Sequence, residues 1–440
     1  MIQLPALSTA HALQIFQALR LGALILSSVL LAKTGLRTTD IGQYEALLYL
    51  GASVSFFWVV GLLQAIAPEY ARLLRDTPEA PERPRQLLFN VFLVFYALSA
   101  GVFVLLYMGK SVVLPALTGL SDIPHYHWFC LYLLFNLPTI PVEHFYLVHD
   151  KPWPIVIWGL VSAGCQLLCF FVPIYAGWGM EGAFMGLFVL ALLKFGWTLG
   201  VVRGFTLPIP DLSLIRPYLH FALPLMANTL VGNLILLFDN WLVGWYYRDE
   251  AVFAIFRYGS REFPLATALA TALGMAMVPR LSAAPEAGMA ELKTRSRRLM
   301  HGLFPLSIAL LFLSKPLFPW VFNPDFAASA PLFNIYLLLT ASRVLLPNAL
   351  LLARGESRIL LWVGLAELML KISLGYWFIQ VWGLPGLAFS VVICFWFEKV
   401  ALILYLEQKL GMRTDDWLDL KWYGWYTALL LGSWAAAEAF

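Results

Sequence analysis

The residues of this 440-residue chain that could do chemistry are charged side chains set inside long apolar stretches. A basic side chain in the middle of a bilayer costs about 2.5–3.5 kcal/mol, so each is expected to face the protein interior, to pair, or to reach for the interface. The stretches hold eight basic residues, Arg20, Lys194, Arg257, Arg261, Lys315, Arg343, Lys371 and Lys399. They also hold five acidic residues, Glu143, Asp239, Glu262, Glu367 and Glu398.

Part of the basic set predicts a cationic cavity. Arg257 and Arg261 are four positions apart, so we expect them on one face of a helix. Arg20 lies in the middle of an apolar run that contains no acidic residue. These three arginines, with Lys371 as a weaker member, predict a cavity in the outer half of the membrane. Its expected ligand is an anion such as a diphosphate, because guanidinium groups bind phosphate oxygens through two parallel hydrogen bonds.

Two acidic residues predict ion pairs. Glu367 and Lys371 are four positions apart, in the order that favours a pair on one helix. Asp239 and Arg257 lie equally far from the centre of a turn, which places them at equal depth on adjacent helices. A structural ion pair is the simpler interpretation of both, and a role of Asp239 and Glu367 in ion coupling is the alternative.

A third acidic residue, Glu143, precedes His144. The two can relay protons or simply pack and pair, and both interpretations stay open. All four cysteines lie in apolar runs and are expected to pack as small apolar residues. We identify no metal-ligand set, Walker loop or dinucleotide fingerprint. The sequence therefore predicts no metal, cofactor or nucleic-acid partner, and leaves H⁺ or Na⁺ coupling open.

The elements that position these residues follow from composition. The chain is 61% hydrophobic and 12% charged, with a mean hydropathy of +0.77. A soluble protein carries roughly twice that charged fraction. Apolar runs of about 20 residues, long enough to cross a bilayer, recur along the chain. They lie at 10–32, 41–67, 87–108, 125–149, 154–174, 182–202, 218–245, 252–279, 300–322, 328–352, 359–380, 384–406 and, more weakly, 422–438.

These runs predict an all-α polytopic membrane protein. The last run either spans the membrane or lies in its interface, where its Trp and Tyr residues are favoured. With the N-terminus in the cytoplasm, the inside loops hold 17 Lys and Arg residues and the outside loops hold four. This ratio predicts a cytoplasmic N-terminus.

A short turn motif, WGxxG, occurs twice, as "WGMEG" at 178–182 and "WGLPG" at 382–386. A shift of about 204–210 positions also superposes the first two spans on spans seven and eight. This pattern predicts two pseudo-symmetric six-helix lobes around a central cavity, since an even number of spans keeps both lobes in one orientation. The lobes are expected at 1–205 and 206–410, followed by a cytoplasmic linker and an additional C-terminal hydrophobic segment at 411–440.

The stretch 221–283 carries a resemblance to a known family. Its elements are "FALPL" at the start of the seventh span, Asp239 late in that span, Tyr258 early in the next and Pro279 at its exit. They resemble the second lobe of polysaccharide flippases in the multidrug/oligosaccharidyl-lipid/polysaccharide flippase superfamily. "AKTGLRTTDIGQYEALLYL" and "LLARGESRILL" resemble other turns of that family, so the resemblance extends over the first twelve spans.

The resemblance implies a protein of the bacterial cytoplasmic membrane that works by alternating access. It implies movement of a polyprenyl-diphosphate-linked oligosaccharide from the inner to the outer leaflet, for cell-surface polysaccharides such as the O-antigen of lipopolysaccharide. It also implies a cationic cavity, with Arg20 in helix 1 and Arg257 and Arg261 in helix 8. The expected partners are this lipid-linked oligosaccharide and membrane lipids.

Two other functions are alternatives. A cation-coupled drug exporter of the same superfamily should favour acidic cavity residues, but the spans hold eight basic and five acidic residues. A membrane-embedded polysaccharide polymerase or ligase should display a large outer loop, but the longest one is about 109–124. Since function is argued from the site, we expect a transporter and no enzymatic activity.

Overall fold

The structure, a computed structural model, describes residues 7–439. Within this range all regular secondary structure is helical and there is no strand. Nine helical segments in the range are long and apolar enough to cross a membrane. The predicted all-α, multi-pass membrane fold is therefore confirmed. The chain divides by its contacts into two units, the first running to Asn233 and including Gly244–Ala251, the second comprising Leu234–Val243 and the chain from Val252 onward.

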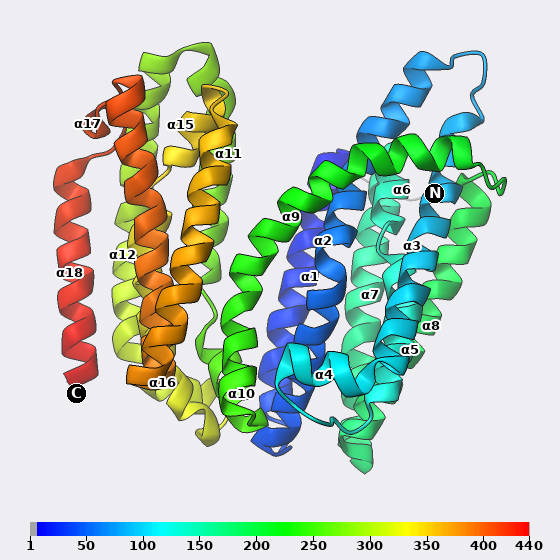
Figure 1. The fold of residues 1–440 in the computed structure, drawn as a ribbon, viewed down its shortest axis with the longest axis horizontal. Helices are drawn as coiled ribbons and strands as arrows, with labels where there is room; N and C mark the ends of the chain where they lie inside the picture. Colours follow the sequence, from blue (N-terminus) through cyan, green and yellow to red (C-terminus); the bar gives the residue numbers. More distant parts are fainter. Residues whose placement is uncertain (1–6, 440) are drawn as a thin grey trace. The chain divides into compact units, whose positions relative to one another are not determined.

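Unit 1 is a bundle of helices from the first half of the chain (Figure 1). Its elements are α1 (Thr9–Ala32), α2 (Thr38–Asp76), α3 (Arg83–Met108), α4 (Lys110–Thr118), α5 (Tyr126–Asn136), η1 (Leu137–Thr139), α6 (Val142–Val148), α7 (Pro152–Pro173), η2 (Ile174–Trp178), α8 (Gly179–Phe205) and most of α9 (Leu212–Tyr247). Among its largest fully buried side chains are Phe95, Phe129, Phe145 and Phe184.

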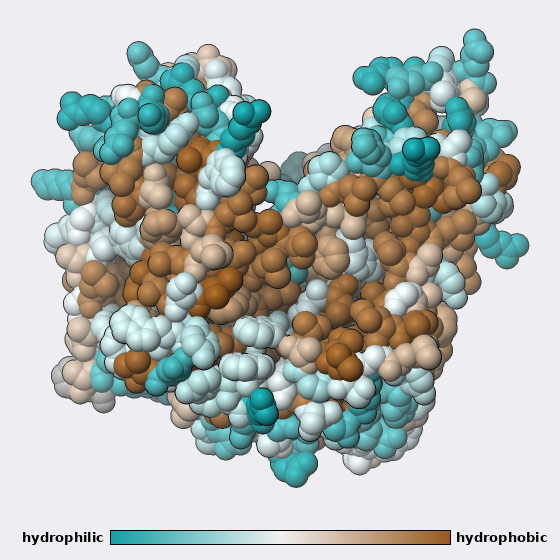
Figure 2. All heavy atoms as spheres, viewed as in Figure 1, coloured by the Kyte–Doolittle hydropathy of each residue, from teal (hydrophilic) through white to brown (hydrophobic). Residues whose placement is uncertain are grey.

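Unit 2 is a bundle of helices from the second half of the chain. Its elements are the remainder of α9, most of α10 (Glu250–Gly259), α11 (Pro264–Ala283), α12 (Pro285–Val321), η3 (Pro324–Ala328), α13 (Ser329–Leu337), α14 (Leu339–Arg343), α15 (Pro347–Ala353), α16 (Ser357–Leu410), α17 (Thr414–Trp417) and α18 (Leu420–Ala439). In each unit, apolar side chains form a band across the helices and hydrophilic ones gather at the ends (Figure 2).

Each predicted apolar run lies on one helix or on consecutive helices, and α16 carries two of the runs. Three of the runs are interrupted by a break in the helix. The run 125–149 is interrupted after Asn136, and the run 252–279 is interrupted between Gly259 and Pro264. The run 328–352 is interrupted before Pro347. Prolines account for the breaks, because a proline lacks the N–H that would continue a helix and restricts the residue before it. Breaks in membrane helices leave backbone groups that must be satisfied inside the protein.

The repeated turn adopts one conformation in both places. Gly179 has φ 58° and ψ −149°, and Gly383 has φ 63° and ψ −144°. This region is accessible essentially to glycine alone. Each turn joins two antiparallel arms of a hairpin, and the turn of α16 is visible at the bottom of Figure 1. In the first hairpin, α7 and α8 approach so closely that a Cβ added to Gly186 would lie 1.7 Å from the carbonyl oxygen of Cys169.

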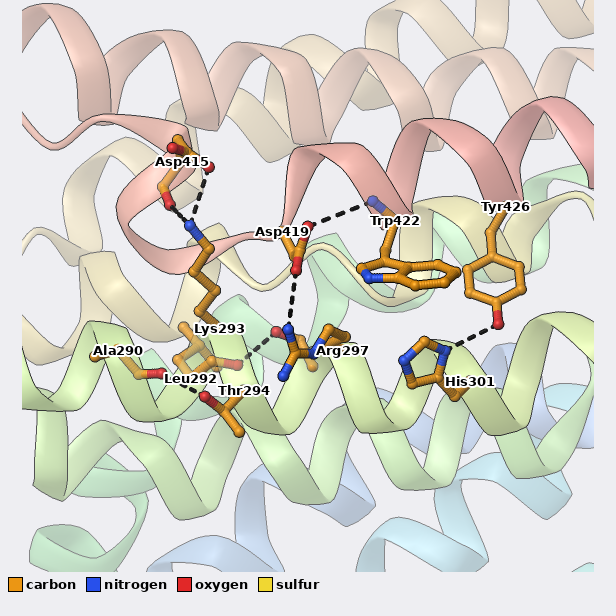
Figure 3. A network of polar contacts seen from close by, with 11 residues as sticks. Ala290, Leu292, Lys293, Thr294, Arg297, His301, Asp415, Asp419, Trp422 and Tyr426 are labelled. Atoms are coloured by element: carbon orange, nitrogen blue, oxygen red, sulfur yellow. Dashed lines mark hydrogen bonds and ion pairs between the residues drawn. The ribbon is translucent and has the colours of Figure 1, made fainter.

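The C-terminal hydrophobic segment forms α18, which lies along α12. At one end, Arg297 contacts Asp419 at 3.4 Å and His301 contacts the hydroxyl of Tyr426 at 2.9 Å (Figure 3). At the other end, Lys315 donates a hydrogen bond to the carbonyl of Ala437 at 2.7 Å. The contacts advance along both helices in the same direction, so the helices are parallel. They remain together over 18 positions, or about 27 Å, which is close to the thickness of a bilayer's hydrocarbon core.

The close approach of α7 and α8 gives a stability prediction. We expect Gly186→Ala to destabilise unit 1 by about 1–3 kcal/mol, because the new methyl group would meet backbone that has no room to move. The measurement is the thermal unfolding midpoint of the purified protein in detergent. Gly196→Ala is the matched control, since it lies on the same helix with no atom within 4 Å of the added Cβ. Equal midpoints for both variants would contradict the hairpin geometry.

The register of α18 gives a topology prediction. If α18 crosses the membrane alongside α12, the chain crosses thirteen times and its two ends lie on opposite sides. We therefore expect alkaline phosphatase fused after residue 440 to be active outside the cell, while the same reporter at the N-terminus is inactive. A fusion after Gly411, which precedes α17 and α18, is the control and should be inactive. An inactive fusion at residue 440 would place α18 in the interface instead.

Candidate functional site

Unit 1 encloses a cavity of about 450 Å³ among α1, α2, α7, α8 and the broken segment from α5 to α6. Its walls are largely apolar, formed by side chains such as Phe16, Val59 and Trp158. Polar side chains converge on it from several helices. They include Gln17, Arg20, Asn136, Glu143, His144 and Lys194. A concave apolar site with a few convergent polar groups is typical of a ligand-binding cavity, and its volume lies within the usual range.

Helix geometry brings these groups together. On α1, Phe16, Arg20 and Leu24 all line the cavity and are spaced by four residues, so they share one helix face. The break between α5 and α6 places Asn136 at the end of one helix and Glu143 in the first turn of the next. Both side chains line the cavity, so the proline-rich break exposes polar groups to it from adjoining helical ends.

Lys194 is the first of two cations in the cavity. Its ammonium donates a hydrogen bond to Oδ1 of Asn136 at 2.7 Å and lies 5.7 Å from the centre of the Trp158 ring. Both partners are neutral, so its positive charge is held in place without being neutralised by direct contact. A cation over an indole face gains modest electrostatic stabilisation, which helps to orient the ammonium.

Arg20 is the second cation. Its side chain is exposed to the cavity, and residues 7–439 offer its guanidinium no hydrogen bond or ion pair within contact distance. Its charge interacts through space with those of Glu143 and Lys194. A guanidinium carries five N–H donors in a rigid fork, and in a membrane such a group is costly unless an anion is offered to it.

Glu143 is the one carboxylate among the residues that line the cavity, and it is only 3% exposed. Its nearest ionisable contact is Nδ1 of His144 at 3.9 Å, which is beyond hydrogen-bond distance. That nitrogen and the hydroxyl of Ser162 are buried without a partner in the described part of the chain. With His144 neutral, two cations face one carboxylate, so the cavity carries a net positive charge and suits an anion.

The sequence-predicted residues divide between the units. Arg20, Glu143 and His144 meet in the cavity of unit 1, while the others lie in unit 2. Their placement differs from the prediction in two respects. Asp239 does not pair with Arg257: its carboxylate binds the ammonium of Lys371 at 2.8 Å, while Arg257 donates to the side chain of Asn240 at 3.5 Å.

Asp239 binds Lys371 in place of the predicted partner Arg257 because the two side chains form a buried pair. Asp239 and Lys371 are 6% and 2% exposed, and the Lys371 ammonium donates a further hydrogen bond to the carbonyl of Ile235 at 2.7 Å. A long lysine side chain from α16 can reach α9, so a tertiary contact replaces the predicted direct pair of Lys371 with Glu367. Glu367 is itself buried and interacts with Lys371 electrostatically.

The second correction concerns Arg257 and Arg261. The predicted continuous helix ends at Gly259, so Arg261 lies in the break between α10 and α11 and shares no helix face with Arg257. The Arg261 guanidinium lies 4.8 Å from the centre of the Tyr258 ring. In the same break, Glu262 accepts a bidentate contact from Arg343, with an Nη2–Oε1 distance of 2.7 Å and an Nε–Oε2 distance of 3.0 Å.

Sequence reasoning did not single out Lys194 and Asn136 as cavity residues. Lys194 was one of eight intramembrane cations, and nothing in its own run distinguished a cavity residue from a side chain that reaches the interface. The available signal was Asn136, a polar residue two positions before Pro138 in an apolar run. A proline break beside a polar residue is a recognisable mark of a membrane site.

No family model and no curated protein matches the sequence. Solved structures do match. The chain is similar to the lipid II flippase MurJ in its inward closed conformation, with 15% identity and a TM-score of 0.67 over 94% of this chain and 90% of that one. It is also similar to an inward-facing multidrug resistance MATE family transporter of the MOP superfamily, with 14% identity and a TM-score of 0.58 over 98% and 97%. A third similar structure is the Vibrio cholerae MATE transporter VcmN in its bent form, with 14% identity and a TM-score of 0.55 over 97% of this chain and 98% of that one.

These structures establish the fold of the chain. The chain shares its fold with a structure named a lipid II flippase and with structures named MATE transporters, over nearly its whole length. One of the similar structures is named as a transporter of the superfamily that the sequence resembles. At this level of identity the likeness defines the architecture, and the function depends on the residues of the cavity.

The buried pair in unit 2 gives a prediction. We expect Lys371→Met to destabilise the protein by about 3–5 kcal/mol, because it leaves the Asp239 carboxylate buried without its cation. The double variant Asp239→Leu with Lys371→Met should recover most of that loss, since neither charge then remains. Thermal unfolding of the wild type, both single variants and the double variant measures the coupling. Additive effects of the two single changes would show that the pair does not stabilise the fold.

Proposed function

We propose that this protein is a flippase that moves a polyprenyl-diphosphate-linked oligosaccharide from the inner to the outer leaflet of the bacterial cytoplasmic membrane by alternating access. Its product would serve cell-surface polysaccharide synthesis, such as that of the O-antigen of lipopolysaccharide. The observation that carries this proposal is the Arg20 guanidinium, which faces a net-positive cavity without a direct partner in residues 7–439. Lys194 adds a second positive charge from another helix.

A diphosphate fits this arrangement chemically. Its oxygens can accept hydrogen bonds from the guanidinium fork of Arg20 and from the ammonium of Lys194. Charge-assisted hydrogen bonds of this kind are stronger than neutral ones and gain further strength where water is scarce. Gln17, Asn136 and Gln166 also line the cavity and offer amide groups of the kind that bind sugar hydroxyls. The lipid tail needs no enclosed site, because it can remain in the bilayer.

The comparisons support a transporter of this class. One similar structure is named a lipid II flippase, and the others are named MATE transporters. The MATE likeness makes a cation-coupled multidrug exporter the second candidate, which the buried carboxylate of Glu143 also favours. The excess of positive charge in the cavity argues against a cationic drug, because like charges repel most strongly in a dry site. We assign the chain no catalytic step, and we place its N-terminus in the cytoplasm.

The proposal predicts that flipping depends on Arg20. In liposomes that contain the purified protein, we expect Arg20→Gln to slow the movement of a fluorescent polyprenyl-diphosphate oligosaccharide by about tenfold or more. The reason is the loss of charge-assisted hydrogen bonds, each worth about 1.5–3 kcal/mol. Arg20→Lys should retain part of the rate, because it keeps the charge and loses only the fork geometry.

Arg203→Gln is the matched control. It removes a basic residue from α8, the helix that carries Lys194, but at an exposed position outside the cavity. Wild-type flipping by Arg20→Gln, with normal folding, would remove the basis of the proposal. Ion-driven movement of a cationic dye by the wild type, without movement of the lipid, would establish the drug exporter instead.

A further inference from the structure

Glu143 gives the cavity a second property. Among the described residues that line the cavity it is the one acid, and it is nearly fully buried in the first turn after a helix break. It makes no direct ion pair with Arg20 or Lys194 in the described range, yet its charge interacts with both through space. It is therefore the counter-charge that the two cations share within the protein itself.

An anionic substrate competes with Glu143 for these cations. The diphosphate of a lipid-linked sugar carries two negative charges and would approach the same two groups. A carboxylate and a diphosphate in one low-dielectric cavity repel each other, and the repulsion is relieved when the carboxylate takes up a proton. With Glu143 neutral, two cations and two phosphate charges balance. With Glu143 charged, the loaded cavity would carry one excess negative charge into the membrane.

We propose that Glu143 takes up one proton from solvent when the diphosphate substrate binds, and releases it when the substrate leaves. This inference rests on the proposed function and names the coupled ion. The proton forms an O–H bond on a Glu143 carboxyl oxygen, and no other bond changes. The two phosphate charges and one proton move together, so one net negative charge crosses the membrane with each substrate. A membrane potential that is negative on the loading side therefore still drives export.

Other ionisable groups face Glu143 from the surrounding helices. They are Arg20 on α1, Tyr132 on α5, His144 on α6 and Lys194 on α8, while the cavity residues of α2 and α7 do not ionise. His144 is the competing proton acceptor, since its Nδ1 is buried without a partner among the described residues. The tests must therefore distinguish Glu143 from His144.

The first test counts protons by titration calorimetry. The ligand is a short-chain prenyl diphosphate linked to N-acetylglucosamine, a diester whose two phosphates keep their charge across the pH range used. Binding to the full-length protein is measured in buffers with different heats of ionisation. We expect the wild type to take up as much as one proton per ligand, and its affinity to rise as pH falls between about pH 8.5 and 5.5, by at most about tenfold per pH unit.

Variants assign the proton. Glu143→Gln should bind the ligand with no proton uptake and with an affinity that does not depend on pH. His144→Gln should keep the uptake. Glu69→Gln is the matched control: Glu69 is also a buried carboxylate of unit 1, 5% exposed and paired with Arg72, but it lies outside the cavity lining. If Glu143→Gln does not fold, Glu143→Asp replaces it and should retain the uptake.

The outcomes separate the two proposals. Binding without proton uptake, at an affinity that is constant with pH, overturns the inference and leaves the flippase standing. Uptake that persists in Glu143→Gln and disappears in His144→Gln also overturns it. Absence of binding by the wild type at every pH overturns the proposed function itself. In liposomes, the rate of flipping should rise when the loading side is made more acidic than the other side, and an unchanged rate contradicts the inference.

Discussion

The absence of water from the hydrocarbon core of a membrane is the constraint on which this structure depends. Every backbone N–H and C=O there must find a partner inside the protein, and every charge must be paired, shielded or used. Helices satisfy the backbone, which explains why all regular secondary structure in the described chain is helical. Where proline interrupts a helix, as between Asn136 and Glu143, the chain must satisfy freed groups locally. Such breaks therefore occur beside polar side chains, and in unit 1 they open onto the cavity.

Charged side chains have different partners in the two units. In unit 2, Asp239 binds Lys371, Glu262 binds Arg343, and Glu398 lies 2.9 Å from Lys399. These pairs neutralise charge in place, and the first two join separate segments of the chain. In unit 1, Arg20 and Lys194 have no carboxylate of residues 7–439 in direct contact, although Glu143 is nearby. A ligand that took one partner out of a buried pair would leave the other charge unpaired, which is costly. We therefore expect an anionic ligand to contact Arg20 and Lys194, which are not held in such pairs within residues 7–439. The contrast supports a binding role for unit 1 and a structural role for the pairs of unit 2.

The flippase proposal and the proton proposal share one electrostatic argument. A site that binds an anion strongly in a dry environment must also let it go, and a buried carboxylate between the same cations provides that balance. When the substrate leaves, the Glu143 carboxylate can regain its charge and stabilise Arg20 and Lys194. When the substrate binds, a proton removes the competition. Under the two proposals, selectivity against cations and reversibility for anions would both depend on three side chains, Arg20 on α1, Glu143 on α6 and Lys194 on α8.

The sequence by itself determined the fold class, the positions of the apolar runs and the repeated turn, because apolar length and glycine-dependent backbone conformations are local properties. Gly179 and Gly383 have nearly the same dihedral angles, and each is the second residue of the same short motif, WGxxG. It also marked Arg20 and Glu143 as intramembrane charges that need an explanation. Only the tertiary structure decided which charges meet. Lys371 binds Asp239 from another helix, and Lys194 joins Arg20 across a cavity. Such pairings depend on the rotation of each helix and on breaks such as that after Gly259, which hydropathy and spacing do not encode.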